Sequence, residues 1–167
     1  MNAPAKPGAP AHWPGLEWRW CRFEGLDLRQ LQAIHRARQQ VFVVEQSCAF
    51  LDADAYDEFS FHLAAWSPSH REPLAYARVI DPGHKHEEPS IGRVLTTSLA
   101  RGQGLGRELV GRAIARTRSA WPGHAIRISA QSRLLAFYAA FDFRAVGAAY
   151  LEDGIEHIDM LLAPASR

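Results

Sequence analysis

The strongest constraint on the fold comes from residues 101–107, which read Arg-Gly-Gln-Gly-Leu-Gly-Arg. The run before this loop, residues 91–97, has the composition of a strand, and the stretch after it repeats apolar residues with the period of an amphipathic helix. The alternating glycines permit positive φ angles and remove the Cβ atoms that would keep a ligand away from the backbone. The first amides of such a helix, its dipole and two arginines all favour negative charge. The sequence therefore predicts a phosphate-binding loop between a strand and a helix.

Motif chemistry narrows the ligand of this loop. A P-loop requires Lys and Ser/Thr after its last glycine, whereas Gly106 is followed by Arg107 and Glu108, so no hydroxyl is available for magnesium. A dinucleotide fingerprint counted from the first glycine requires a further glycine where the chain has Arg107. The spacing does match Arg/Gln-x-x-Gly-x-Gly/Ala, and here the chain resembles the GNAT superfamily of N-acetyltransferases. The resemblance implies that the pyrophosphate of acetyl-CoA is held by Arg101, Gly102, Gln103, Gly104, Leu105, Gly106 and Arg107. The alternative is an ordinary glycine-rich turn.

Length and composition limit what else the chain does. We expect one domain over residues 16–167, after a disordered tail over residues 1–15 that contains four prolines and no apolar signal region. The formal net charge of +1 argues against nucleic acid or an anionic membrane as a partner, and no apolar run has membrane-spanning length. Cys21 and Cys48 lack metal-type spacing and form no disulfide scaffold, so a cytoplasmic location fits best.

Periodicity and turn residues predict the element order β-α-β-β-β-α-β-α-β-β, which implies an α/β fold of the α+β kind. We expect a central mixed, mostly antiparallel sheet of about seven strands with helices on both faces. Asp153-Gly154 predicts a tight hairpin. The expected strands cover residues 17–23, 61–66, 74–80, 91–97, 125–130, 143–150 and 155–162. The expected helices run from Asp27 to about Gln40, from Leu105 to the stop at Trp121, and from a Ser132 cap to about Phe141, with a buried segment over residues 41–46.

This order also resembles the acyl-CoA N-acyltransferase (GNAT) fold, and shorter stretches resemble its ElaA-type subgroup of bacterial acetyltransferases. The matching stretches are residues 41–46 with Cys48, 75–78, 91–94, 121–122, 137–138 and 153–158. One departure is Asp142, which stands where the family has glycine at the end of a helix. Aspartate tolerates the left-handed conformation better than most residues, so we expect the turn to survive.

Acetyl transfer to an amine requires a held thioester, a polarised carbonyl and a proton for the leaving thiolate. The resemblance implies that the backbone of Val94, Leu95 and Thr96 lines the pantetheine and that a main-chain N–H there polarises the thioester. Tyr138 matches the tyrosine of the family, and a phenol with a pKa of about 10 holds its proton until a thiolate develops. It lies one step off the core pattern of Phe137 and Phe141, although it could also be a packing aromatic.

The general base is open on sequence alone. Glu45 stands in an apolar run, where it acts as a base or pairs with an arginine such as Arg38 or Arg78. His157 is a candidate because histidine as a residue type changes charge near neutral pH, although a structural histidine is the favoured interpretation. His62, among apolar neighbours, is a third candidate that we interpret as structural. A chain of water molecules is a further possibility.

Two charged loops allow weaker interpretations. The carboxylates of Asp52, Asp54, Asp57 and Glu58 form either an acidic rim that attracts a cationic amine or a set of solvated caps. The tract from His84 to Glu88 holds too few fixed ligands for zinc, so we expect no metal. Cys48 has nothing near it in sequence that lowers its pKa, which argues against a covalent acetyl-enzyme.

The expected function is therefore an acetyl-CoA-dependent N-acetyltransferase in which an amine attacks the thioester directly. Tyr138 is the general acid, and Glu45 and His157 are the leading candidates for the base. The acceptor is a small-molecule or peptide amine of unknown identity, and the protein is a monomer or a homodimer. The alternatives are a non-catalytic acyl-CoA-binding or interaction module and a regulatory domain for another phosphorylated ligand.

Overall fold

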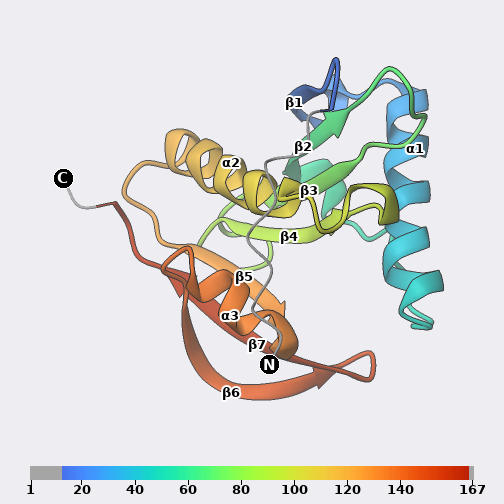
Figure 1. Ribbon diagram of the computed structural model, residues 1–167. Coiled ribbons are helices and arrows are strands. Elements are labelled where there is room, and N and C mark those ends of the chain that lie inside the picture. The colour runs from blue at the N-terminus through green and yellow to red at the C-terminus, as the bar shows by residue number, and fades with distance from the viewer. Residues whose placement is uncertain (1–12, 166–167) are drawn as a thin grey trace, which may run out of the picture.

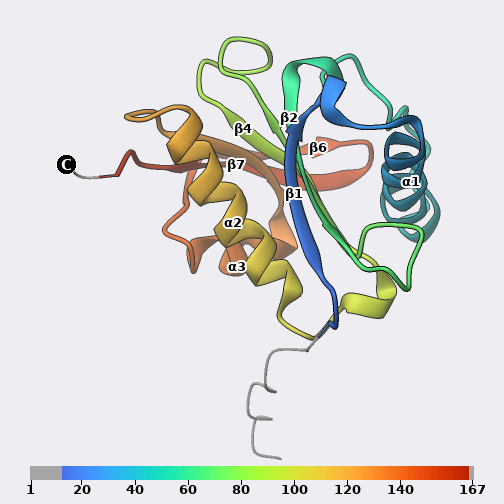
Figure 2. The ribbon, with the colours of Figure 1, turned by 90° about the horizontal axis from the view of Figure 1, so that it is seen from above.

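The computed structural model describes residues 13–165, and a seven-stranded sheet in the order β1-β2-β3-β4-β5-β7-β6 runs through them. Only β4 and β5 are parallel; every other neighbouring pair is antiparallel. Helix α1 covers one face of the sheet, while α2 and α3 lie on the other (Figures 1 and 2). The mixed, mostly antiparallel sheet with helices on both faces confirms the predicted fold class.

The elements follow the predicted order, with small changes at their ends. The strands are β1 Glu17–Arg22, β2 Ser60–Trp66, β3 Ala75–Ile80, β4 Ser90–Thr96, β5 Ile126–Gln131, β6 Arg144–Glu152 and β7 Ile155–Leu162. The helices are α1 Leu28–Arg38, α2 Leu105–Ala120 and α3 Leu135–Ala139. Asp27 begins α1 with a capping box, because its side chain accepts from the amide of Gln30 while the Gln30 side chain accepts from the amide of Asp27.

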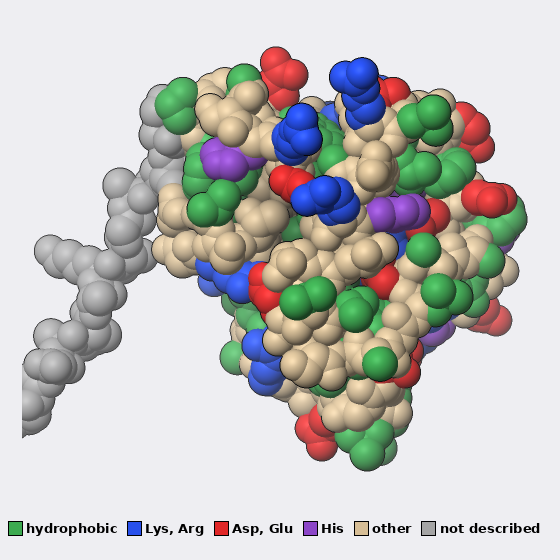
Figure 3. All heavy atoms as spheres, turned by 90° about the vertical axis from the view of Figure 1, so that its right-hand side faces the viewer, with side chains coloured by type: hydrophobic (Ala, Val, Ile, Leu, Met, Phe, Trp, Pro, Cys, Tyr) green, Lys and Arg blue, Asp and Glu red, His purple; other side chains and the backbone are tan. Residues whose placement is uncertain are grey.

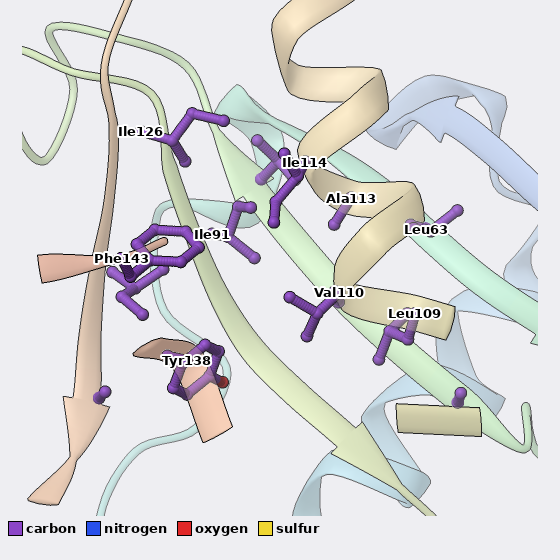
Figure 4. Packing of buried hydrophobic residues seen from close by; sticks show 14 of the residues in the cluster. Leu63, Ile91, Leu109, Val110, Ala113, Ile114, Ile126, Tyr138 and Phe143 are labelled. Carbon is purple, nitrogen blue, oxygen red and sulfur yellow. The ribbon is translucent and has the colours of Figure 1, made fainter. Parts of the chain in front are cut away.

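The core lies mainly between α2 and the sheet. Side chains alternate along β2 and β3, so Leu63 and Ala77 face α2 while Ala64 and Tyr76 face α1. Figure 4 shows Leu109, Val110, Ala113 and Ile114 of α2 directed at the strands, with Phe143 and Tyr138 closing the cluster at its other end. Burial of these α2 side chains fixes the start of the helix, and with it the glycine loop, against the end of β4.

Two local predictions are wrong. Residues 41–46 were expected as a buried segment, but α1 continues there as a π-helix, Gln39–Glu45, in which Val41 is buried and Val44 is 62% exposed. The apolar run is thus one face of a widened helical turn. Ser132 does not cap the third helix with its side chain: it begins a 3₁₀ turn, Ser132–Leu134, and α3 starts only at Leu135.

Two turn predictions agree with the structure. Asp153 and Gly154 have φ angles of 50° and 78° and join β6 to β7, as a type I′ hairpin turn requires. Asp142, at the end of the α3 region, has a φ of 67°, so aspartate does adopt the left-handed conformation there.

The predicted tail over residues 1–15 falls mostly outside the described residues. Trp13, near its end, packs against the main core cluster and makes an edge contact with His70 at a ring separation of 6.1 Å. Within residues 13–165, no helix combines the length and apolar character needed to cross a membrane.

Candidate active site

The central feature of the site is a cleft where β4 and β5 separate. The two strands pair only at Ser90 with Arg127 and at Ile91 with Ile128. Beyond these pairs the edge of β4 that faces β5 borders a cavity of about 750 Å³, and its lining includes Gly92, Arg93, Val94, Leu95 and Thr96. In Figure 1, β5, β7 and β6 splay away from the first four strands at this point. Amide and carbonyl groups of β4 are therefore exposed to an extended ligand that lies along the strand.

A bulge interrupts β4 inside this cleft. Arg78 lies opposite Gly92 and Tyr76 lies opposite Leu95, so β4 carries one more residue than β3 over the interval. Arg93 is in this interval with a φ of 51°, a left-handed conformation that is uncommon for a residue with a side chain. The bulge takes Arg93 and Val94 out of the regular ladder with β3, and both residues line the cavity.

The glycine loop follows β4 at the open end of the cleft. Gly102 and Gly104 have φ angles of 73° and 82°, and a Cβ added at either would point into open space while straining the backbone. Gly104 is the N-cap of α2, and no side chain caps the first turn of that helix. A Cβ on Gly106 would contact Thr96 at 3.6 Å, so the loop packs closely on the end of β4. The amides of a 16-residue helix thus face a region free of side chains, which suits an anion.

Glu45 and Arg101 form an ion pair at the border of the cavity. Arg101 Nη2 donates to Glu45 Oε2 at 2.6 Å, and Arg101 Nε donates to the carbonyl of Thr96 at 3.1 Å. Sequence reasoning named Arg38 or Arg78 as the partner of Glu45, and that choice of partner is wrong. Since both side chains line the cavity, the pair connects the glycine loop to the end of the π-helix.

Tyr138 lies where the cavity meets the core. Its side chain packs on Phe137 and Phe143, at ring separations of 5.1 and 6.0 Å, and also lines the cavity. Tyr138 is 6% exposed, which is less than Phe137 or Phe141, so its expected position outside the core pattern is wrong. Burial alone raises the pKa of Tyr138 to about 12. Its hydroxyl therefore stays protonated across the neutral range.

The two histidine candidates have different surroundings. His157 of β7 lines the cavity, with Nδ1 at 2.8 Å from the carbonyl of Ile155 and its ring stacked on Tyr150. His62 is 1% exposed and makes hydrogen bonds to the Tyr76 hydroxyl and to the carbonyl of Asp57, at 2.7 and 3.0 Å. Burial is the main cause that lowers the pKa of His62. His62 therefore belongs to the interior and not to the cavity wall, in agreement with its interpretation as structural.

Three of the four carboxylates expected to form an acidic rim, those of Asp52, Asp54 and Asp57, instead belong to a network with three arginines, whereas Glu58 is exposed. Asp57 accepts from Arg38 at 2.8 Å and from Arg78 at 2.7 Å, although Arg38 is fully buried and Arg78 is 2% exposed. Burial would raise the pKa of Asp57, but the two guanidinium groups outweigh it and hold the pKa below its ordinary value. The interpretation as a cation-attracting rim is therefore wrong for this carboxylate, which sits with its charge neutralised inside the protein.

Sequence reasoning missed several residues of the cavity wall. Phe42, Phe50, Tyr56 and Arg93 all line the cavity, and the Arg93 guanidinium lies 5.3 Å from the centre of the Phe50 ring. For Arg93, the signal in the sequence is that one loop holds three aspartates while arginines stand elsewhere in the chain. This indicates ion pairs but does not identify the partners.

Side chains of the tract from His84 to Glu88 contact other groups of the protein. His84 stacks on Phe59 at 4.2 Å, and Glu88 pairs with Arg127 at 2.9 Å. Among residues 13–165, no three His, Cys, Asp or Glu side chains come together as a ligand set for a metal ion.

Comparison with known proteins identifies the family. A family model described as "Acetyltransferase (GNAT) domain" matches residues 34–163. The chain is 42% identical over 146 residues to the UPF0039 protein sll0451 of Synechocystis sp., which covers 87% of this chain and 94% of that protein. It is 35% identical over 147 residues to protein ElaA of Escherichia coli, which covers 87% of this chain and 95% of ElaA.

Solved structures agree. An acyl-CoA N-acyltransferase from Pseudomonas aeruginosa superposes with a TM-score of 0.84 at 40% identity, covering 89% of this chain and all (100%) of that one. Escherichia coli ElaA superposes with a TM-score of 0.81 at 34% identity, covering 87% and 98%. A CoA-dependent acyl-homoserine lactone synthase, BjaI, shares the fold alone, with a TM-score of 0.73 at 14% identity. The chain therefore belongs to the GNAT family of acyl-CoA-dependent acyltransferases, has the acyl-CoA N-acyltransferase fold, and resembles ElaA in particular.

Proposed function

We propose that the protein transfers the acetyl group of acetyl-CoA to the primary amine of a small-molecule or peptide acceptor. The observation that carries this proposal is the exposed edge of β4, which runs along the cavity and leads directly into the glycine loop. An extended arm with amide groups and a pyrophosphate at its end matches this order of sites. Pantetheine forms hydrogen bonds with the main chain of Val94, Leu95 and Thr96, and the pyrophosphate lies on the loop from Arg101 to Arg107.

The chemistry is direct attack. The amine nitrogen bonds to the thioester carbon, and the carbon–sulfur bond then breaks to release CoA as its thiolate. A main-chain N–H at the β4 bulge donates to the carbonyl oxygen, which carries negative charge as the amine attacks. The amine loses one proton and the thiolate gains one, so the products are an amide and free CoA.

Tyr138 supplies the proton for the thiolate. Its pKa of about 12 keeps the hydroxyl intact at neutral pH, and no neighbouring charge contributes to that pKa. The same raised pKa makes complete proton transfer costly, so the first contribution of the hydroxyl is a hydrogen bond to the developing thiolate.

The proton of the amine passes to Glu45, to His157 or to water. Both side chains line the cavity, and His62 is too deeply buried to compete. Glu45 is paired with Arg101, which is also a ligand of the pyrophosphate in this proposal, so cofactor binding and the availability of Glu45 are linked. His157 keeps one ring nitrogen on the carbonyl of Ile155.

The rival function is a non-catalytic module that binds acyl-CoA without transferring the acyl group. The cavity favours catalysis because its lining is not confined to β4: Gln46, Tyr56, Gln131 and His157 also line it, and its volume of about 750 Å³ offers space for an acceptor. A module that only binds the cofactor has no need of that space.

The deciding experiment is titration with acetyl-CoA by calorimetry, together with Gly104→Val. We expect micromolar binding in the parent and at least about a tenfold loss in the variant, because valine is strained at a φ of 82° and places methyl groups in front of the helix amides. Ala115→Val, at an exposed position on α2, is the matched control and should bind normally. A parent protein that fails to bind acetyl-CoA would overturn the proposal. Binding without acetyl transfer in a broad amine screen would support the module.

A further inference from the structure

We propose that Arg93 is a positioning residue. It holds the β4 bulge in the conformation in which a main-chain N–H of the bulge faces the acyl carbonyl. This inference rests on the proposed function. It starts from the backbone: Arg93 has a φ of 51° in the interval where β4 departs from its ladder with β3. Glycine adopts this conformation with little strain, whereas arginine does so only where its surroundings enforce it.

The Arg93 side chain is fixed by two aspartates. Its Nε donates to Asp52 Oδ1 at 2.8 Å, and its Nη2 lies 3.2 Å both from the carbonyl oxygen of Asp52 and from Asp54 Oδ2. The guanidinium also lies over the rings of Phe42 and Phe50, at 6.0 and 5.3 Å. A planar fork held at several points fixes the direction of the side chain, and therefore the backbone that carries it.

The two aspartates are themselves anchored to the body of the protein. Asp52 accepts from Arg38 Nε at 2.8 Å, and its carbonyl accepts from Arg38 Nη2 at 2.6 Å. Asp54 accepts from Arg78 Nη1 and Nη2 at 2.5 and 2.8 Å. Arg38 comes from α1 and Arg78 from β3, and both are buried. The bulge is thus connected through Arg93 to two rigid elements on different sides of it.

The same contacts argue against Arg93 as a residue that binds an anionic ligand directly. Its positive charge is already matched by Asp52 and Asp54, and its side chain is only 22% exposed. An additional anion at this point would compete with two anchored carboxylates. Arg93 therefore acts on the reaction through the bulge and not through contact with substrate.

The test compares the affinities for acetyl-CoA and for free CoA, and it requires no acceptor. The bulge N–H meets the acyl carbonyl only in acetyl-CoA. Arg93→Ala removes the contacts of the side chain and is strained at a φ of 51°, so we expect it to lose about three- to tenfold in affinity for acetyl-CoA, as for one net hydrogen bond. Binding of CoA should stay within about twofold, because the glycine loop and the rest of β4 are unchanged. A residue with a merely structural role would lower both affinities together.

Two further variants complete the design. Arg93→Lys keeps the charge without the planar guanidinium, so it should lose an intermediate fraction of the acetyl-CoA preference. It replaces the alanine variant in the comparison if that variant does not fold. Ser47→Ala is the matched control, since Ser47 also has a φ of 50° but is exposed and lies outside the cavity wall. Folded Arg93 variants that keep the parental ratio of the two affinities would overturn the inference and leave the proposed function intact. A parent that binds neither ligand would overturn the proposed function itself.

Discussion

Tyr138 combines two demands in one side chain. Its ring fills a place in the core between Phe137 and Phe143, and its hydroxyl is the polar group that the side chain offers to the cavity it lines. Phenylalanine keeps the first of these features and removes the second. The residue is therefore well suited to a substitution that separates packing from chemistry.

We expect Tyr138→Phe to lower kcat by about 10²-fold or more, the usual contribution of a positioned proton donor. Affinity for acetyl-CoA should change by less than about threefold, because the lost hydroxyl group meets charge only when the thiolate forms. Steady-state kinetics with any accepted amine, combined with calorimetric binding, would measure both quantities. Equal turnover in parent and variant would remove Tyr138 from the mechanism.

The roles of individual residues were the least predictable part of the sequence. The glycine loop was predictable from the sequence, since glycine permits the positive φ values found at Gly102 and Gly104. The conformation of Arg93 was not predictable, because its φ depends on Asp52 and Asp54, which are 41 and 39 positions away in the chain. A carboxylate in a polar loop has the same sequence signature whether it faces water or a buried guanidinium.

At the scale of elements, the short helix α3 ends in a residue that is unusual for its place. Asp142 has a φ of 67°, and its amide donates to the carbonyl of Ala139 at 3.0 Å. The amide of Phe143 then lies 3.4 Å from the carbonyl of Tyr138. This turn sets the position of Tyr138 at the cavity, so strain in the turn is close to the proposed chemistry.

Asp142→Gly should raise the free energy of unfolding by up to about 1 kcal/mol, because glycine adopts the left-handed conformation without a Cβ clash. Ala140→Gly is the matched control: Ala140 is exposed with a φ of −67°, so glycine there should destabilise by about 0.5–1 kcal/mol. Urea unfolding of both variants measures the difference. A destabilised Asp142→Gly protein would show that the aspartate side chain makes a contribution that exceeds the strain.

Element order and fold were predictable because hydrophobic periodicity and turn residues act locally. The Asp27 cap, the stop at Trp121 and the Asp153-Gly154 hairpin all depend on neighbours in the chain. The π-helix over Gln39–Glu45 was missed because its apolar run fits a buried segment as well as a widened turn. The late start of α3 was missed because Ser132 has the right type for a cap but begins a 3₁₀ turn instead.

At the scale of the whole molecule, charge is distributed in two ways. On the face that carries α1, acidic and basic side chains are interspersed (Figure 3). Inside, the network of Arg38, Arg78 and Asp57 joins α1, β3 and the loop before β2. Salt screens these buried ion pairs little, and their contribution to stability depends strongly on the ionisation of the aspartates.

We expect stability to fall in two steps as the solution is acidified. The pKa of His62 is lowered by burial, so its contribution is complete above its unfolded pKa of about 6.5 and declines below it, as the unfolded chain takes up a proton. For Asp54 and Asp57, burial acts to raise the pKa, but the arginines lower it by more, so the net pKa is below its ordinary value. The contribution of these groups to stability is therefore complete above about pH 4 and is lost below it.

Urea unfolding at pH 7.5, about 5 and about 3.5 resolves the two steps. His62→Gln is the control: it should lack the first step and keep the second, since glutamine does not titrate. A free energy of unfolding that stays constant from neutral pH to about pH 3.5 would contradict the assignment of these groups as a buried charged network.

The short ladder between β4 and β5 also determines how the molecule deforms. Within the sheet, four strands on one side and three on the other are joined by two paired positions, while the crossover through α2 and the main core cluster also connect the two halves. We expect bending of such a sheet to be concentrated where this ladder is short, while each half of the sheet remains stiff. A ligand that lies in the cleft and hydrogen-bonds to both halves connects them across this point. We therefore expect the sheet to bend less when the cleft is occupied than when it is empty.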